Sequence, residues 1–201
     1  MSYMAIGRAG DPGLHAPLLD SMFRLRHDIF HERLRWEVRV ENGREHDWFD
    51  LIGPRYIIAH DGQANAHGCC RLLPTQGPNM LRDIFPDLLD GAPVPVGEHI
   101  WEVSRFAIGE HLARDGYGFS EIPMRIIAAG IRLADRHNVE SLVGVTSAAF
   151  ERLMLHMGVK VERLGRPRRI GSVMSLAFRL PVDANLAVVG PEPRPEVAQA
   201  A

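Results

Sequence analysis

The sequence has little of three features that would narrow its class at once: cysteine, net charge and long apolar runs. Only two cysteines occur in 201 residues, and the formal net charge is −2. A disulfide framework and a general nucleic-acid binder are therefore excluded. Every window of about 20 residues contains charge, which excludes a membrane span. The N-terminal residues lack the basic-then-apolar order of a signal peptide, so we expect a cytoplasmic protein.

The composition is that of one globular domain, since 46% of the residues are hydrophobic and 24% are charged. Residues 183–201 are rich in proline and alanine and predict a loosely ordered tail, so we place the single domain at residues 1–182. Cys69 and Cys70 are neighbours in a predicted strand and point to opposite faces, so they are not expected to pair.

The spacing of apolar residues predicts helices over residues 18–35 and 122–137, with shorter ones near 81–89 and 150–157. Strands are predicted over residues 56–59, 67–73, 100–108, 142–146, 159–164 and 172–180. Residues 41–50 are acidic, lack an apolar period and predict a loop. This order indicates an α/β (α+β) protein with one central mixed sheet and helices on both faces.

Three polar clusters interrupt this pattern, and the first two lie before residue 51. Arg26 and Phe30 share a helical face close to Trp36. An arginine beside two aromatic rings can bind an anion or stack on a planar cation. The same residues would also be explained by a core aromatic pair beside a surface arginine. Asp47 and Asp50 enclose two aromatic residues in the acidic loop. They can grip an ammonium or sulfonium group, or belong to a solvated loop.

The third cluster lies in the predicted strand over residues 101–106. Alternation predicts two faces, with Glu102, Ser104 and Phe106 on one and Trp101, Val103 and Arg105 on the other. Glu102 and Arg105 are costly to bury without partners, and Arg71 is a plausible partner for Glu102. An edge strand with an exposed polar face would explain the same residues.

Histidines and glycines give weaker signals. His27 and His31 are four residues apart, but no carboxylate or cysteine joins them in a ligand pattern, and we expect no metal site. Residues 113–118, ARDGYG, nearly match the RxxGxG loop that holds the coenzyme A pyrophosphate in N-acetyltransferases, with Ala113 in place of the first arginine. The glycines still suit an anion-binding loop before a helix.

Taken in order, the clusters resemble the N-acyl-homoserine lactone synthases, the autoinducer synthases of bacterial quorum sensing. The matching strings are RLRHDIFHERLRWEV (24–38), EHDWFD (45–50), CRLLPT (70–75), GPNMLRDIF (77–85) and WEVSRFAI (101–108). The residues of the family's signature are all present, as Arg26, Phe30, Trp36, Asp47, Asp50, Arg71, Phe85, Glu102 and Arg105. The resemblance is dense over residues 24–108 and extends only to the fold beyond them.

The resemblance implies an N-acetyltransferase-like fold, a twisted mixed sheet flanked by helices. It implies an acyltransferase that joins S-adenosylmethionine to an acyl thioester carried on acyl carrier protein or coenzyme A. The products are the acyl-homoserine lactone, methylthioadenosine and the free carrier. No cofactor is expected, because S-adenosylmethionine is a substrate.

The same resemblance assigns roles to the signature residues. Glu102 is the expected general base for the amine, with Arg71 and Arg105 beside it and backbone N–H groups near residues 103–106 facing the oxyanion. The S-adenosylmethionine side is expected to comprise Arg26, Phe30, Trp36, Asp47, Asp50 and Phe85. Asp47 and Asp50 can equally hold this segment by pairing with Arg71 and Arg105.

Two further expectations concern the acyl donor. Residues 151–179 contain seven basic residues against two acidic ones. This excess of positive charge favours an acidic acyl carrier protein over coenzyme A as the donor. A basic surface could also bind the phosphates of coenzyme A, or be a solvated loop with no partner. The expected carrier contacts are Lys160, Arg163, Arg166, Arg168 and Arg169. An acyl pocket between the sheet and the later helix is expected from Met124, Ile127, Leu142, Val143, Val145, Phe150 and Leu153. Val143 aligns with a position where the family often has a hydroxyl residue, which favours an unsubstituted chain.

Two alternatives compete with the synthase interpretation. An N-acyltransferase using acyl-coenzyme A and another amine would be expected to keep the complete pyrophosphate loop that Ala113 interrupts. A regulatory binding module would be expected to lack one or more of the signature residues, and none is missing.

Overall fold

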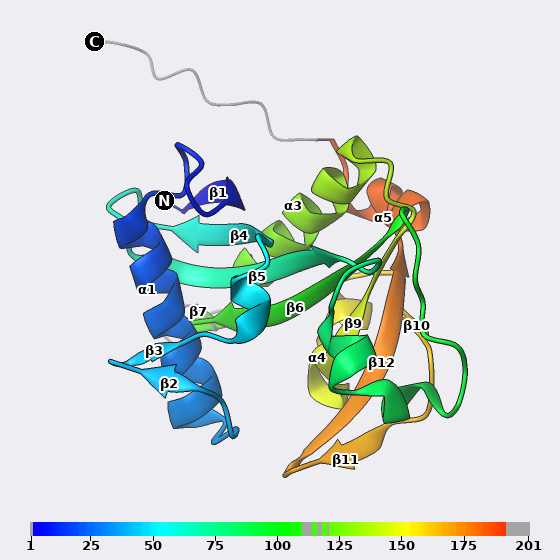
Figure 1. Cartoon of the computed structure of the whole chain (residues 1–201). Coiled ribbons are helices and arrows are strands. Elements are labelled where there is room, and N and C mark those ends of the chain that lie inside the picture. Colours follow the sequence, from blue (N-terminus) through cyan, green and yellow to red (C-terminus); the bar gives the residue numbers. More distant parts are fainter. Residues whose placement is uncertain (1, 110–113, 116–117, 120, 192–201) are drawn as a thin grey trace.

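A mixed sheet of eight strands organises the molecule (Figure 1). The structure is a computed structural model that describes residues 2–109, 114–115, 118–119 and 121–191. The strands run in the order β1 (Tyr3–Arg8), β4 (Arg55–His60), β5 (Ala66–Pro74), β6 (Ile100–Ile108), β9 (Ser141–Ser147), β12 (Val173–Pro181) and β10 (Glu162–Arg163), and β11 (Arg168–Ile170) also pairs with β12. Among the described strands of this sheet, only β6 and β9 pair in parallel. The predicted fold class is confirmed.

Helices cover both faces of the sheet because its central strands alternate which side chains they bury. On one face, Ile58 and Cys69 pack in a cluster with Leu18 of α1 (Ala16–Arg26). On the other, Ile57 and Cys70 pack in the cluster that contains α3 (Ile122–Arg136). Neighbouring residues thus face opposite sides, and both cysteines are free thiols, as expected.

Shorter elements complete the two layers. The π-helix η1 (His27–Arg33) continues α1, and α4 (Ala148–His156) follows β9. On the α1 face, α2 (Met80–Asp83) and η3 (Pro86–Leu89) share a cluster with Val143 and Ala177. The predicted loop 41–50 contains a hairpin, β2 (Val40–Glu41) and β3 (Arg44–Glu45), and the 3-10 helix η2 (Trp48–Asp50).

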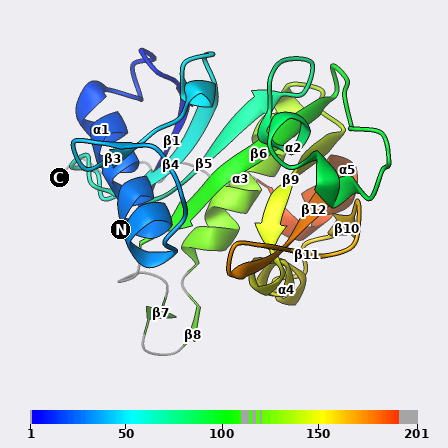
Figure 2. The ribbon, with the colours of Figure 1, turned by 60° about the horizontal axis from the view of Figure 1, so that its bottom comes forward.

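Strands β7 (Arg114–Asp115) and β8 (Gly118–Phe119) form a separate small hairpin beyond the end of β6 (Figure 2). The predicted pyrophosphate loop, 113–118, lies partly outside the described residues.

The parallel strands β6 and β9 stay paired over only part of their length. Their register runs from Ile100 opposite Ser141 to Val103 opposite Gly144, whereas the strands continue to Ile108 and Ser147. A Cβ atom at Gly144 would lie 2.4 Å from the carbonyl oxygen of Val103. Glycine therefore permits the close approach at the last paired position, after which β6 has no partner from β9.

A bulge in β6 changes the alternation that the sequence predicts. The register between β5 and β6 shifts between Cys69 and Arg71, and Arg105 has a φ of 53°. Phe106 consequently packs with the α3-face cluster and Ala107 with the α1-face cluster. The predicted faces are therefore wrong for Arg105 and Phe106, because the bulge keeps Arg105 on the face of Ser104.

The predicted tail begins too early. Helix α5 (Val182–Val189) covers residues that we expected to be loosely ordered, and it packs on α3 through the core cluster. The side chain of Asn185 fixes it, accepting from the backbone N–H of Lys160 and donating to the carbonyl of Pro181. Residues 192–201 lie outside the described residues. No helix in the described residues is both long and apolar enough to cross a membrane.

Candidate active site

Six charged side chains meet where α1, η2, β3, β5 and β6 come together. Three are arginines and three are carboxylates, so the cluster is neutral overall: Arg26, Arg71, Arg105, Glu45, Asp47 and Asp50. The side chains of Arg26, Arg71 and Glu45 have no solvent exposure, and that of Arg105 is 10% exposed. Charges removed from water in this way need close partners.

Arg26 crosses from α1 to the acidic segment. Its Nε donates to Glu45 at 2.6 Å, and its two terminal nitrogens each donate to a carboxylate oxygen of Asp50 at 2.9 Å. Burial alone would lower the pKa of Arg26, but the two carboxylates outweigh it and raise the pKa. The predicted helical arginine is thus a fully buried cation with two anionic partners.

Asp50 accepts hydrogen bonds from four residues of the site. Besides Arg26, it accepts from Arg71 at 2.9 Å, from the hydroxyl of Tyr56 at 2.8 Å and from the backbone N–H of Asp47 at 2.9 Å. Burial acts to raise the pKa of Asp50, but the guanidiniums of Arg26 and Arg71 hold it well below its ordinary value. Asp50 is therefore an ionised structural centre.

Asp47 ties the same loop to the two other arginines. It accepts two hydrogen bonds from Arg71, at 2.5 and 3.1 Å, and lies 2.8 Å from Nη2 of Arg105. Of the two roles that the sequence left open for Asp47 and Asp50, the structure contains the pairing with arginines. Every carboxylate of the cluster already faces at least one guanidinium.

Aromatic rings border the arginines. The guanidinium of Arg105 lies 5.5 Å from the centre of the Phe30 ring, and Phe30 stacks on Trp36 at 5.2 Å with an angle of 11° between the rings. Phe30 is buried, whereas Trp36 is 38% exposed. The structure thus brings Arg105, Phe30 and Trp36 into one continuous stack that ends at the surface.

Glu102 lies beside this cluster with different partners from those we predicted. Its two carboxylate oxygens accept from the backbone N–H groups of Met80, at 3.0 Å, and Leu81, at 2.6 Å, at the start of α2. Arg71 donates instead to Asp47, Asp50 and Ser104, so the predicted pairing is wrong. Burial raises the pKa of Glu102.

Glu45, Tyr56 and Met80 are site residues that the sequence analysis missed. Glu45 lies in the quoted string EHDWFD, and its own partners, Arg26 and Arg105, were singled out without it. The sulfur of Met80 lies 3.3 Å from Arg71 and 3.2 Å from Arg105, so Glu102 and both arginines converge on one residue. No periodic signal marks such a contact between α2 and the sheet.

The predicted acyl-pocket residues do not form one group. Those that pack with the α3-face cluster are Met124, Ile127, Leu142 and Phe150. Val143 and Val145 pack on the opposite face with α2 and η3, and Leu153 is a half-buried residue of α4. Neighbouring side chains along β9 point to opposite faces of the sheet, which separates Leu142 from Val143. The prediction that all seven residues line one pocket between sheet and helix is therefore wrong. Phe85 also packs in the cluster with α2 and η3.

Known proteins that resemble this chain show its family. A family model described as autoinducer synthase matches residues 14–188. An acyl-homoserine-lactone synthase of Pseudomonas aeruginosa is 35% identical over 173 residues, which cover 85% of this chain and 86% of that one. The chain belongs to the autoinducer synthase family.

Solved structures of autoinducer synthases share the fold. The crystal structure of the AHL synthase LasI superposes with a TM-score of 0.84 at 33% identity, covering 96% of this chain and 99% of that chain. The coenzyme A-dependent acyl-homoserine lactone synthase BjaI, solved with SAM and isopentyl-CoA, gives 0.82 at 25% identity and covers 96% and 92%. The predicted acetyltransferase-like fold and the predicted transferase activity are confirmed.

The basic surface that we predicted for the carrier is partly neutralised in this synthase. Arg163 pairs with Glu151 at 2.6 Å, while Arg166 and Arg168 both pair with Asp90 from the loop after η3. The sequence count over residues 151–179 missed Asp90 because it lies far away in the chain. Among the described residues, Arg152, Lys160 and Arg169 are exposed and have no ion pair.

Replacing Glu45 tests whether the buried charges hold the N-terminal segment of the synthase. We expect Glu45→Gln to lower the free energy of unfolding by about 3 kcal/mol, because Arg26 and Arg105 then share one carboxylate fewer in a buried site. Chemical denaturation followed by circular dichroism measures the loss.

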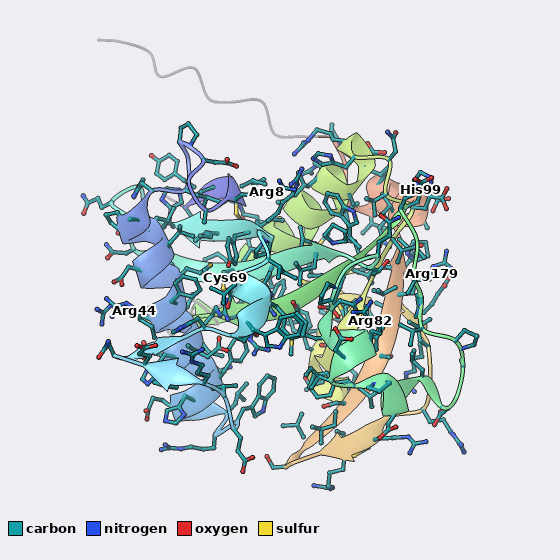
Figure 3. All side chains as sticks on the ribbon, viewed as in Figure 1. Arg8, Arg44, Cys69, Arg82, His99 and Arg179 are labelled. Atoms are coloured by element: carbon teal, nitrogen blue, oxygen red, sulfur yellow. The ribbon has the colours of Figure 1, made fainter. Side chains whose placement is uncertain are left out.

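Asp20→Asn is the matched control, since Asp20 pairs with Arg24 and Arg44 at the surface and should matter little. Equal midpoints for the two variants would contradict a structural role for the cluster. Arg44, the partner of Asp20, lies on the α1 side of the molecule, and Arg179 of the basic surface lies on the opposite side (Figure 3).

Proposed function

We propose that this synthase joins S-adenosylmethionine to an acyl group carried on acyl carrier protein and closes the product to an N-acyl-L-homoserine lactone. The arrangement that supports it best is Glu102 beside the neutral charge cluster, with an aromatic stack leading to the surface. The reaction needs no cofactor in this proposal, and it takes place in the cytoplasm, where both substrates are made.

The first step is acylation of the amine. Glu102, directly or through one water, accepts a proton from the ammonium group of S-adenosylmethionine, and the free amine attacks the thioester carbonyl. The carbon–sulfur bond then breaks, and the leaving thiolate takes the second proton that the nitrogen loses, so the carrier departs as a thiol. Each oxygen of Glu102 accepts one backbone hydrogen bond and keeps lone pairs for this proton, and its raised pKa makes the carboxylate a better base.

Backbone N–H groups near residues 103–106 are proposed to bind the oxyanion of this step. Pairing between β6 and β9 ends at Val103, and the bulge at Arg105 turns the strand immediately afterwards. Donors that are not used in the sheet can point at developing charge in the substrate. This is the stretch of β6 next to Glu102.

The aromatic stack is the proposed contact for the sulfonium substrate. The carboxylates of the cluster all face arginines, so they are poorly placed to attract another cation. Trp36 presents an exposed ring, and cations bind over the faces of such rings. We therefore assign the adenosyl and sulfonium groups to the exposed ring of Trp36, with the buried ring of Phe30 stacked beneath it and Arg26, Asp47 and Asp50 holding that segment in place.

Lactone formation follows in the same site. The substrate carboxylate attacks its own γ-carbon, the carbon–sulfur bond breaks, and methylthioadenosine leaves with the electron pair. This step requires that the bound chain folds back on itself, which positioning supplies without a further proton transfer.

An acyl carrier protein is the proposed donor because exposed cations remain unpaired beside β10 and β11. Arg152, Lys160 and Arg169 can steer an acidic partner even after Asp90 has neutralised part of the surface. The alternative donor is acyl-coenzyme A, which is favoured by the likeness to a synthase solved with isopentyl-CoA.

The test is a turnover assay with S-adenosylmethionine and the same acyl chain on acyl carrier protein or on coenzyme A. We expect methylthioadenosine and lactone, measured by mass spectrometry, to appear together and only when a thioester is present. Turnover should be faster with the carrier protein. Acylation of another amine without methylthioadenosine would contradict the proposal, and faster turnover with acyl-coenzyme A would contradict the choice of donor.

Replacing Glu102 separates a base from a structural anchor. We expect Glu102→Gln to slow turnover about 100-fold. In the unmodified enzyme, kcat/KM should rise with pH through a pKa above the ordinary value of about 4.3, because only the ionised carboxylate accepts a proton. In Glu102→Gln this rise of kcat/KM on the acid side of the pH profile, its acid limb, should be absent.

Asn79→Ala is the control for Glu102, because Asn79 caps the same end of α2 by accepting from the N–H of Arg82. If Glu102 acted only by holding α2, the two variants would slow turnover alike and both would keep the acid limb.

Charge reversal at the basic surface tests the carrier. We expect Arg169→Glu to lower kcat/KM about tenfold with acyl carrier protein and to leave turnover of a short, uncharged acyl thioester unchanged. Arg8→Glu is the control, since Arg8 lies on β1, far from Arg179 and the basic surface (Figure 3). An equal effect of both variants on the carrier reaction would exclude this surface as the docking site.

A further inference from the structure

The backbone after α1 does not continue as an α-helix. Residues His27–Arg33 form a π-helix, and the N–H of Leu34 bonds to the carbonyl of Ile29, five residues earlier, at 3.0 Å. Turns of this kind are rare and occur frequently at functional sites. The inner face of this one buries Ile29 and Phe30, whose ring supports Arg105.

The wide turn changes which residues share the outer face. In an α-helix, a residue five positions along points about 140° away from the first. In a π-helix each backbone hydrogen bond spans five residues instead of four, so the residues four and five positions after the first both lie beside it. His27, His31 and Glu32 occupy these positions, and ligand atoms of all three lie within 4.8 Å of one another. The sequence expectation that no carboxylate joins the two histidines is wrong for this reason.

The distances are close to those of a metal site. Oε1 of Glu32 lies 3.6 Å from Nε2 of His27 and 3.7 Å from Nε2 of His31, and the two imidazole rings stack at 5.3 Å. Ligands held about 2.0–2.2 Å from a tetrahedral zinc ion are about 3.3–3.5 Å apart. Small side-chain rotations would therefore bring the three atoms onto one ion.

Neighbouring side chains orient the same three atoms. Nδ1 of His27 lies 3.1 Å from the carboxylate of Asp28, which leaves Nε2 to face Glu32. A carboxylate behind a histidine is the usual support of a metal-binding imidazole. Arg35 lies 3.5 Å from Oε2 of Glu32 and leaves Oε1 toward the histidines.

We propose that His27, His31 and Glu32 bind a divalent transition metal ion, with zinc as the best fit and water as the fourth ligand. The mixture of two imidazoles and one carboxylate suits zinc, and magnesium and calcium prefer all-oxygen sites. His31 and Glu32 are 43% and 51% exposed, so the ion enters from solvent. The bound ion fastens the outer face of the turn whose inner face carries Phe30.

The test measures zinc binding to the full, untagged chain by calorimetry, with cobalt absorption as an independent readout of a tetrahedral site. We expect one saturable site and a rise of about 5 °C or more in Tm when zinc exceeds its Kd a hundredfold. His31→Ala should abolish both. His156→Ala removes another exposed helical histidine and should change neither.

Two further measurements locate the ion. Glu32→Gln keeps the shape but removes the charge, and should weaken zinc about tenfold. Zinc should slow amide hydrogen exchange across residues 27–34 in the unmodified chain and not in His31→Ala. Equal zinc affinity in the unmodified chain and His31→Ala, or protection elsewhere in the chain, would overturn the proposal.

Discussion

The structure depends on the mutual neutralisation of three arginines and three carboxylates in a buried site. Each charge alone would be too costly to remove from water, and the cluster balances because Arg26 and Arg71 share Asp50 while Arg105 bridges Glu45 and Asp47. The partners come from a helix, a hairpin, a 3-10 helix and two strands. The cluster therefore ties these elements to one another through buried ion pairs.

This neutrality also decides what the site can recognise. A carboxylate that already pairs with two guanidiniums gains little from a further cation, so the proposed role of Asp47 and Asp50 is to hold the segment in place. In the proposed function, recognition of the sulfonium then depends on the exposed ring of Trp36, which stacks on Phe30 in the same segment. Buried ion pairs contribute geometry here more than stability.

The sequence predicts the elements that have a regular apolar period, and it fails where tertiary contacts decide. Helix α5 is held by Asn185 and the core, which no local pattern in a proline- and alanine-rich segment reveals. In β6, strict alternation places Arg105 opposite Glu102, and one bulge reverses that result. The signature residues could be found by resemblance, but Glu45 and Met80 join the site through contacts across the sheet.

The π-turn at His27–Arg33 connects these points. An α-helical continuation of α1 would rotate Glu32 away from His27, because a residue five positions along then points about 140° from the first. The same distortion thus serves the buried aromatic contact inside and the ligand cluster outside. In the proposed zinc-bound state, an ion on the outer face would also restrain the Phe30 ring beside Arg105, since the six residues from His27 to Glu32 carry both.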